Sequence, residues 1–244
     1  VVGTNGPTVV TQNVSIYLDA NGNATTSASA VNNGSSSVCG IASMSLSKTS
    51  FNCSNVGNNT VTLTVTDVNG NANSATATVT VIDNTYPTVV TKSANIDLGS
   101  NGSATVQLSD VYTSSSDNCG IANVTLSKSN SGIVSPTYAC SETGSQTVYV
   151  VVQDNSGNTT YQAASIVVRD ANDPVAVGQD LTVYVNANGS ATITANDVDN
   201  GSTDNCGITS KTIDKSTFNC NNVSLNNNGL LSGIVSADNE FTAY

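Results

Sequence analysis

Apolar and polar residues alternate along several short stretches of the chain. Residues 14–18 read VSIYL, residues 61–65 VTLTV, residues 75–81 ATATVTV and residues 147–152 TVYVVV. Alternation with period two, rich in β-branched residues, is typical of strands with one buried face. Between these stretches lie Gly-containing pairs that favour tight turns: Asn21-Gly22, Asn69-Gly70, Asn101-Gly102, Ser156-Gly157 and Asn188-Gly189. Because no window has convincing 3.6-residue spacing, the pattern predicts an all-β fold.

The same sequence pattern is written three times. The repeats begin at Pro7, Pro87 and Pro174 and reach Cys-Gly-Ile triplets at Cys39, Cys119 and Cys206. From the first repeat to the second, the proline and the Cys-Gly-Ile triplet move along the sequence by the same number of residues. From the second repeat to the third, they again move together, by a slightly larger number. Short strands in units of about 80 residues predict β-sandwiches. We therefore expect three tandem immunoglobulin-like domains, at residues 1–84, 85–172 and 173–244.

The joints between repeats are short and contain proline, at residues 82–87 (IDNTYP) and 169–174 (RDANDP). Proline stops the preceding strand, and neither joint has the Gly and Ser content of a flexible tether. We therefore expect a semi-rigid rod. The third repeat departs from the pattern from Leu225 onward, so we expect its domain to be divergent or incomplete. No signal peptide opens the printed sequence, which we therefore expect to be mature or excised.

Composition removes several classes of function. Six Lys and Arg against 17 Asp and Glu give a net charge of −11, which makes nucleic acid an unsuitable partner. No stretch approaches the roughly 18 apolar residues of a membrane span. The chain has no His, and it has no Gly-x-Ser-x-Gly motif to present a nucleophile. We therefore expect that the protein is not an enzyme.

Each repeat carries two cysteines, with the same spacing in the first and third repeats and a longer spacing in the second. An even count that recurs in every repeat of a His-free chain predicts a disulfide framework. The expected pairs are Cys39 with Cys53, Cys119 with Cys140, and Cys206 with Cys220. Closing a loop of roughly 15 residues stabilises a fold by about 3 kcal/mol. Disulfides predict an oxidising compartment, whereas the alternative is reduced cysteines in the domain cores.

Oxygen-bearing side chains gather in the second joint and in three hairpin loops. The acidic spacing of the second joint resembles the calcium-binding joints between cadherin domains, which implies a calcium site formed by Asp170, Asn172, Asp173 and Asp204. The first joint keeps only Asp83 and Asn84 and departs from that pattern. The loops that begin at Asp19, Asp67 and Asp154 also offer oxygens, but we expect their side chains to cap their own turns.

A lysine recurs nine residues after the first cysteine of each repeat, at Lys48, Lys128 and Lys215. Three occurrences in register indicate a structural position. We expect a surface salt bridge there, with an isopeptide bond to Asn as the alternative.

Three sequence phrases resemble a known family. They are DNCGI at residues 117–121 and 204–208, FNCSNVGNNTVTLTVTDVNGN at residues 51–71, and ATATVTVID at residues 75–83. They are similar to HYR-like and related immunoglobulin-like repeats, which occur in tandem in very large bacterial surface adhesins. The first repeat departs from the family at Ser37-Val38, where it lacks the Asp-Asn pair. The resemblance implies extracellular spacer domains and identifies no ligand.

The sequence therefore predicts a stalk or filament segment of an extracellular bacterial adhesin at the cell surface. Its expected partners are neighbouring copies of the protein or further repeats of a parent chain, together with surface glycans or proteins. One alternative is a fibre subunit whose third domain is completed by a donated strand. Another is a calcium-dependent module that binds glycans or proteins.

Overall fold

The computed structural model describes residues 5–222, 224–225, 231–235 and 241–243. It confirms the predicted all-β class, because strands carry the structure and the helices are short. Each repeat contains one four-residue α-helix: α1 (Ala28–Val31), α2 (Leu108–Val111) and α3 (Ala195–Val198). No helix in the described part of the chain is long and apolar enough to cross a membrane.

The first repeat consists of two sheets. The larger has the order β1-β6-β5-β3, with β1 (Val14–Tyr17), β6 (Ala72–Ile82), β5 (Gly57–Asp67) and β3 (Ile41–Leu46). The smaller pairs β2 (Asn23–Thr25) with β4 (Ser50–Asn52), which the 3-10 turn η1 (Cys53–Asn55) follows. Strand β1 runs parallel to β6, whereas the other pairs are antiparallel. Since β2 pairs with β4 and β3 pairs with β5, the chain crosses between the sheets as immunoglobulin-like sandwiches do.

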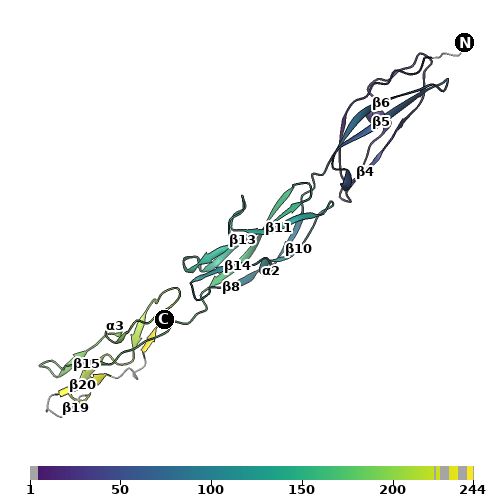
Figure 1. Ribbon diagram of the computed structural model, residues 1–244. Helices are drawn as coiled ribbons and strands as arrows, with labels where there is room; N and C mark the ends of the chain where they lie inside the picture. Colours follow the sequence, from purple (N-terminus) through teal and green to yellow (C-terminus); the bar gives the residue numbers. More distant parts are fainter. Residues whose placement is uncertain (1–4, 223, 226–230, 236–240, 244) are drawn as a thin grey trace. The chain divides into compact units, whose positions relative to one another are not determined.

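The alternation seen in the sequence builds the core of this sandwich. In the hairpin of β5 and β6 (Figure 1), every second side chain is buried over residues 61–67 and 77–81, including Val61, Leu63 and Val79. Phe51 of β4, which is 3% exposed, belongs to the same apolar cluster. The core therefore lies between the two sheets, and the Thr residues of the hairpin alternate with the buried ones.

The second repeat has the same order of elements with two further strands, β7 (Thr88–Thr91) and β10 (Tyr112–Ser116). Its larger sheet is β11-β13-β14-β8, with β11 (Ile121–Ser127), β13 (Gly144–Asp154), β14 (Thr159–Arg169) and β8 (Ala94–Asp97). Its two-stranded sheets are β12 (Thr137–Ala139) with β9 (Ser103–Thr105), and β10 with β7. The 3-10 turn η2 (Cys140–Glu142) follows β12. As in the first repeat, β8 pairs in parallel with the last long strand, β14.

The third repeat is atypical, as predicted. It keeps β16 (Ser190–Thr192) paired with β18 (Thr217–Asn219), followed by η3 (Cys220–Asn222). The other described strands are β15 (Leu181–Val183), β17 (Lys211–Ile213), β19 (Ser224–Leu225), β20 (Leu231–Val235) and β21 (Phe241–Ala243). Strand β15 pairs antiparallel with β20, where the first two repeats have a parallel pair. The alternative prediction, a fibre subunit completed by a strand from another molecule, concerns the end of this repeat. That end lies partly outside the described residues.

The chain divides into two compact units. Unit 1 contains residues 1–93, 107–135 and 147–164, and unit 2 contains residues 94–106, 136–146 and 165–244. The core of the first repeat lies in unit 1. Unit 2 contains a smaller cluster formed by Ile193, Val198 and Phe218. The domain boundaries at residues 84 and 172 and the semi-rigid rod therefore stay predictions.

Candidate functional site

The disulfides link successive repeats, so the predicted pairing within each repeat was wrong. Cys53 is bonded to Cys119 in unit 1, and Cys140 is bonded to Cys206 in unit 2. Both pairs have a Cα–Cα distance of 5.3 Å and a sequence separation of 66. The remaining two cysteines, Cys39 and Cys220, are free and exposed. The second cysteine of one repeat therefore pairs with the first cysteine of the next.

The length of strand β6 explains why Cys39 cannot reach Cys53. Gly40, next to Cys39, accepts a hydrogen bond from the backbone amide of Val68 in the loop that precedes β6. Cys53 lies at the other end of that strand, with its Sγ 3.7 Å from the carbonyl oxygen of Gly22. An eleven-residue strand is roughly 35 Å long. The two sulfurs are therefore far beyond bonding distance, although the two cysteines are near each other in the sequence.

A polar contact accompanies each disulfide. In the first joint the side-chain amide of Asn118 donates a 3.0 Å hydrogen bond to the carbonyl oxygen of Asp19. In the second, the amide of Asn205 donates a 3.1 Å bond to the carbonyl oxygen of Gly99. These Asn residues directly precede Cys119 and Cys206, so the disulfide and the hydrogen bond are made by neighbouring residues. Sequence reasoning treated the Asp-Asn-Cys-Gly phrase as a family signature and missed this role.

Glycine makes the close approach of the Asn backbone feasible. Gly22 has φ +73°, and a Cβ there would lie 2.9 Å from the carbonyl oxygen of Asn118. Gly102 has φ +70°, and a Cβ there would lie 2.8 Å from the carbonyl oxygen of Asn205. A side chain at either position would adopt an unfavourable backbone conformation and also collide with the neighbouring repeat. The Asn-Gly loops, predicted only as turns, are therefore contact surfaces as well.

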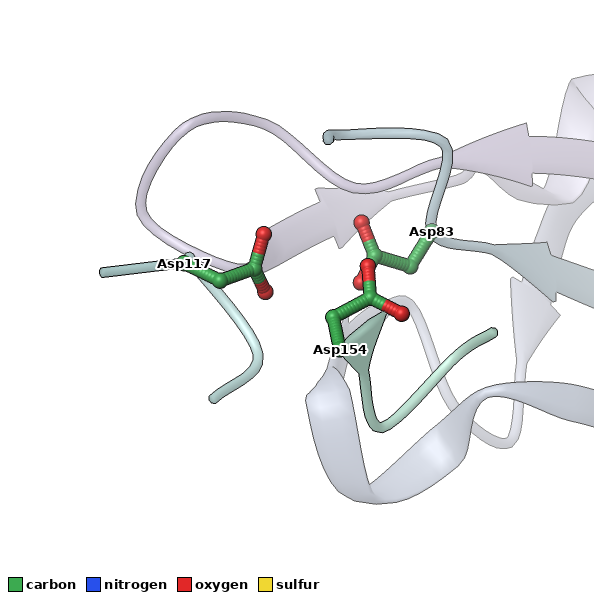
Figure 2. Close-up of side chains that lie close together, drawn as sticks. All are labelled: Asp83, Asp117 and Asp154. Atoms are coloured by element: carbon green, nitrogen blue, oxygen red, sulfur yellow. The ribbon is translucent and has the colours of Figure 1, made fainter. Parts of the chain in front are cut away.

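Three carboxylates converge at the first joint. Asp83 follows β6, Asp117 precedes the Asn118–Cys119 pair, and Asp154 ends β13. Figure 2 shows their carboxyl groups directed toward one another, and one oxygen from each lies within 4.8 Å of the others. Asp83 and Asp154 are only 6% and 1% exposed. All three residues belong to unit 1, although they come from distant parts of the sequence.

Hydrogen bonds satisfy this cluster only in part. The backbone and side-chain amides of Asn158 bind Asp154 at 2.8 and 2.7 Å, and the Ser156 hydroxyl donates to Asp83 Oδ2 at 2.9 Å. Asp117 Oδ2 is buried and has no hydrogen-bond partner among the described residues. Oxygens that share a calcium ion at 2.3–2.6 Å lie at most about 5 Å apart, a limit that the cluster meets. The geometry therefore suits a hard cation, which would take its further ligands from other oxygens or water.

The calcium site expected at the second joint is less convergent. Asn172, Asp173 and Asp204 line one cavity of about 350 Å³. Asp170 is exposed, and its Oδ1 accepts a 3.2 Å hydrogen bond from the Asn172 backbone. Within the described residues, these carboxylates do not form a convergent group of three. The described residues of the third repeat include no acidic hairpin loop like residues 154–158 that could supply a further carboxylate. Calcium binding there stays a prediction.

The Asx-rich hairpin loops cap their own turns, as expected. Asp19 Oδ1 accepts from the backbone amides of Asn21 and Asn23, each at 2.9 Å. Asp67 makes the same contacts in its own loop, and the side-chain amide of Asn71 also donates to it at 3.0 Å. That side-chain hydrogen bond is the main reason why the pKa of Asp67 lies below its ordinary value.

The recurring lysine makes a different contact from the predicted salt bridge. The Lys48 ammonium lies 4.9 Å from the centre of the Phe51 ring, and Lys215 lies 5.0 Å from the centre of the Phe218 ring. Each ring is buried beneath its lysine. In the first and third repeats this cation–π contact covers the edge of the core.

Comparison with known proteins leaves the family of the chain open. No family model matches the sequence, and no curated protein matches it either. Among solved structures, human mucin-like protocadherin EC1-2 covers 68% of this chain and 98% of its own, with 15% identity and a TM-score of 0.32. The four N-terminal Ig domains of Dscam1 isoform 9.44 cover 70% of this chain and 47% of their own, with 11% identity and a TM-score of 0.35. The fibronectin(III)-like modules of Clostridium thermocellum CbhA cover 68% and 95%, with 15% identity and a TM-score of 0.26. TM-scores this low assign neither family nor function.

Proposed function

We propose that this chain is a stalk segment of an extracellular adhesin, in which disulfides tie each immunoglobulin-like repeat to the next. The observation that carries the proposal is the pairing of Cys53 with Cys119 and of Cys140 with Cys206. A spacer must transmit force and hold its repeats in order, and a covalent bond across a joint serves both needs. Stable disulfides also require an oxidising compartment, which supports a location outside the cytoplasm.

The disulfides give the stalk a covalent path that bypasses much of the chain. Each joins residues 66 apart in sequence across a Cα–Cα distance of only 5.3 Å. Tension applied to the ends therefore passes through sulfur and does not stretch residues 53–119 or 140–206. The same arrangement keeps a repeat attached to its neighbour even when its own strands unfold.

Single-molecule stretching tests this role directly. Fully extended residues span about 3.5 Å each, so every reduced disulfide should release roughly 230 Å of additional contour length. We expect the oxidised chain to be shorter than the reduced chain by about twice that length. A C39S/C220S variant serves as the control, because it lacks the free thiols and keeps both inter-repeat disulfides. Equal contour lengths before and after reduction would contradict the proposal.

We propose as a second function that the Asp83–Asp117–Asp154 cluster binds calcium and stiffens the first joint. The buried, unpartnered Oδ2 of Asp117 favours this, because a charged oxygen without a partner is costly to bury. A cation shared by the three carboxylates would connect the joint residue Asp83 to the second repeat. Calcium ions prefer oxygen ligands of this kind.

Matched variants at the two joints test the calcium proposal. Asp117 and Asp204 occupy equivalent positions, and each accepts a hydrogen bond from the backbone amide of the following cysteine. Asp117→Asn keeps that acceptor and removes one negative charge from the cluster, and Asp204→Asn makes the same change outside it. We expect the calcium-induced rise in melting temperature to be smaller in Asp117→Asn than in the wild type, whereas a smaller rise in Asp204→Asn would report calcium bound at the second joint. An unchanged shift in Asp117→Asn would exclude the cluster as the site.

A further inference from the structure

Two cysteines, Cys39 and Cys220, have no partner within this chain. The second cysteine of the third repeat, Cys220, has the position that Cys53 and Cys140 occupy in the bonded joints. The first cysteine of the first repeat, Cys39, has the position of Cys119 and Cys206. We propose that the Gly189–Cys220 surface docks the Cys39 loop of a second molecule of this chain, and that a Cys220–Cys39 disulfide then links the molecules head to tail.

The backbone that carries Cys220 is built as it is in the occupied joints. Strand β18 pairs with β16 so that Asn219 lies opposite Ser190, as Asn52 lies opposite Asn23 in the first repeat. The cysteine then begins a 3-10 turn, which is η3 here and η1 and η2 in the other repeats. The sulfur of Cys220 lies 3.7 Å from the carbonyl oxygen of Gly189, matching the 3.7 Å between Cys53 and Gly22.

The glycine beside Cys220 has the same backbone conformation as the glycines of the two bonded joints, but fewer neighbours among the described residues. Gly189 has φ +71°, close to the +73° of Gly22 and the +70° of Gly102. A Cβ on Gly189 would meet Cys220 Sγ at 2.9 Å, as a Cβ on Gly102 would meet its own cysteine. At Gly22 and Gly102 a Cβ would also strike an Asn carbonyl of the next repeat. At Gly189 no second atom among the described residues lies within 4 Å.

The Cys39 loop has the shape of the occupying loops. Gly40 has φ +85°, compared with +91° for Gly120 and +95° for Gly207. The Cys39 backbone amide donates to Ser37 Oγ at 3.3 Å, where Cys119 donates to Asp117 Oδ1 at 2.8 Å. Cys39 is exposed, so a second molecule has access to its sulfur.

One residue of the Cys39 loop differs from the occupying loops and makes the contact weaker. Val38 stands where Asn118 and Asn205 stand, and its side chain is fully exposed. It has no amide to donate to the carbonyl oxygen of Asn186, which is the position equivalent to Asp19 and Gly99. The proposed docking between molecules therefore depends more on its disulfide than the contact at the two internal joints does. Val38→Asn should strengthen the docking.

The covalent step is thiol–disulfide exchange with a small-molecule disulfide as oxidant. The thiolate of one cysteine attacks the oxidant, breaks its S–S bond and releases one small thiol. The thiolate of the other cysteine then attacks the mixed disulfide and releases the second small thiol. The two protein thiols lose two electrons and two protons in total, and the oxidant becomes two thiols.

Two single variants test the direction of pairing. Full-length C39S carries only the Cys220 thiol, and full-length C220S carries only the Cys39 thiol. When equal amounts are mixed and oxidised with glutathione disulfide, random pairing gives mixed and symmetric dimers in a ratio of 2:1:1. We expect the mixed dimer to exceed each symmetric dimer at least tenfold, as measured by mass spectrometry of the linked peptides. A random ratio, or no dimer, would overturn the proposal.

Further variants separate docking from simple thiol exposure. Val38→Asn in the C220S partner should raise the rate of mixed-dimer formation several-fold, whereas Val38→Ala should not raise it. Gly189→Ala in the C39S partner should lower the rate several-fold, because its Cβ would both displace Cys220 Sγ and occupy space that the incoming loop needs. Equal rates for Val38→Asn and Val38→Ala would overturn the role of this surface even if Gly189→Ala folds poorly.

This inference rests on the proposed function, and one digest distinguishes their failures. If the Cys53–Cys119 and Cys140–Cys206 peptides are present while mixed dimers form at the random ratio, only the docking proposal fails. If those two linked peptides are absent, the stalk mechanism fails as well.

Discussion

At the scale of single residues, two nearly identical loops contain glycines that perform different tasks. Gly22 lies in the loop Asp19–Asn23 and Gly70 lies in the loop Asp67–Asn71, and both have positive φ. Each donates its backbone amide to the carbonyl oxygen of the Asp that opens its loop. Only Gly22 faces another repeat, because a Cβ on Gly70 would meet nothing within 4 Å. The turn requires both glycines, but the joint requires only one of them.

Alanine at these two glycines should separate the requirement of the turn from that of the joint. We expect Gly70→Ala to lower the free energy of unfolding by about 1 kcal/mol, the usual penalty for a side chain at positive φ. Gly22→Ala should lower it by about 1–3 kcal/mol more, because its Cβ would lie 2.6 Å from Cys53 Sγ and 2.9 Å from the Asn118 carbonyl oxygen, two atoms of the joint. Guanidinium denaturation of both variants measures the difference. Equal losses would show that the Gly22 contact is unimportant for stability.

At the scale of elements, a partly buried ion pair secures the short helix of the third repeat. Asp199 follows α3, and its carboxylate accepts hydrogen bonds from the side chains of Lys211 on β17 and Ser202. The Lys211 hydrogen bond, followed by those from Ser202, lowers the pKa of Asp199 from 3.8 to about 2. The carboxylate of Asp197 accepts a hydrogen bond from the backbone amide of Thr194 at the other end of α3, and this hydrogen bond is the main cause of a lowered pKa at Asp197. The helix is thus fixed at both ends by ionised carboxylates.

Acid should therefore weaken the third repeat over a defined range of pH. Because the folded-state pKa of Asp199 lies below its ordinary value, the unfolded chain binds this proton more readily. The contribution is complete above about pH 4 and is lost as pH falls toward 2. We expect the melting temperature to fall across this range, and to fall less in Asp199→Asn, which starts lower at pH 7. Circular dichroism melts at several pH values measure both curves, and parallel curves would contradict this role of Asp199.

At the scale of the whole molecule, the disulfides act over long stretches of sequence. The short loop predicted between Cys39 and Cys53 is replaced by a much longer closed loop, because the true partners Cys53 and Cys119 have a sequence separation of 66. Longer loops lose more conformational entropy in the unfolded state, so each disulfide should stabilise the linked residues by about 4 kcal/mol. The stabilisation is shared by two successive repeats and is not confined to one core.

Removal of one disulfide should measure that contribution. We expect C53S/C119S to lower the free energy of unfolding of unit 1 by about 4 kcal/mol, and C39S to change it by less than about 0.5 kcal/mol. Denaturant titration under non-reducing conditions gives both values. A large loss in C39S, or none in C53S/C119S, would indicate that Cys53 is paired differently.

The sequence by itself determined the fold class and the repeat. The period-two pattern around Val61 and Val79 predicts which side chains face a core, because alternate residues of a strand point to opposite faces. The Asn-Gly pairs identify turns, since few residues adopt positive φ. The Asp residues of the hairpin loops were correctly expected to cap their own turns, because that interaction spans only two to four residues.

Only the tertiary structure decided what meets across the joints. The pairing of Cys53 with Cys119 depends on where a long strand places each end of a repeat, and spacing in the sequence carries no such information. The meeting of Asp83, Asp117 and Asp154 depends likewise on three segments that are distant in sequence and adjacent in space. Local contacts follow from local sequence, whereas contacts between repeats follow from the dimensions of the folded strands.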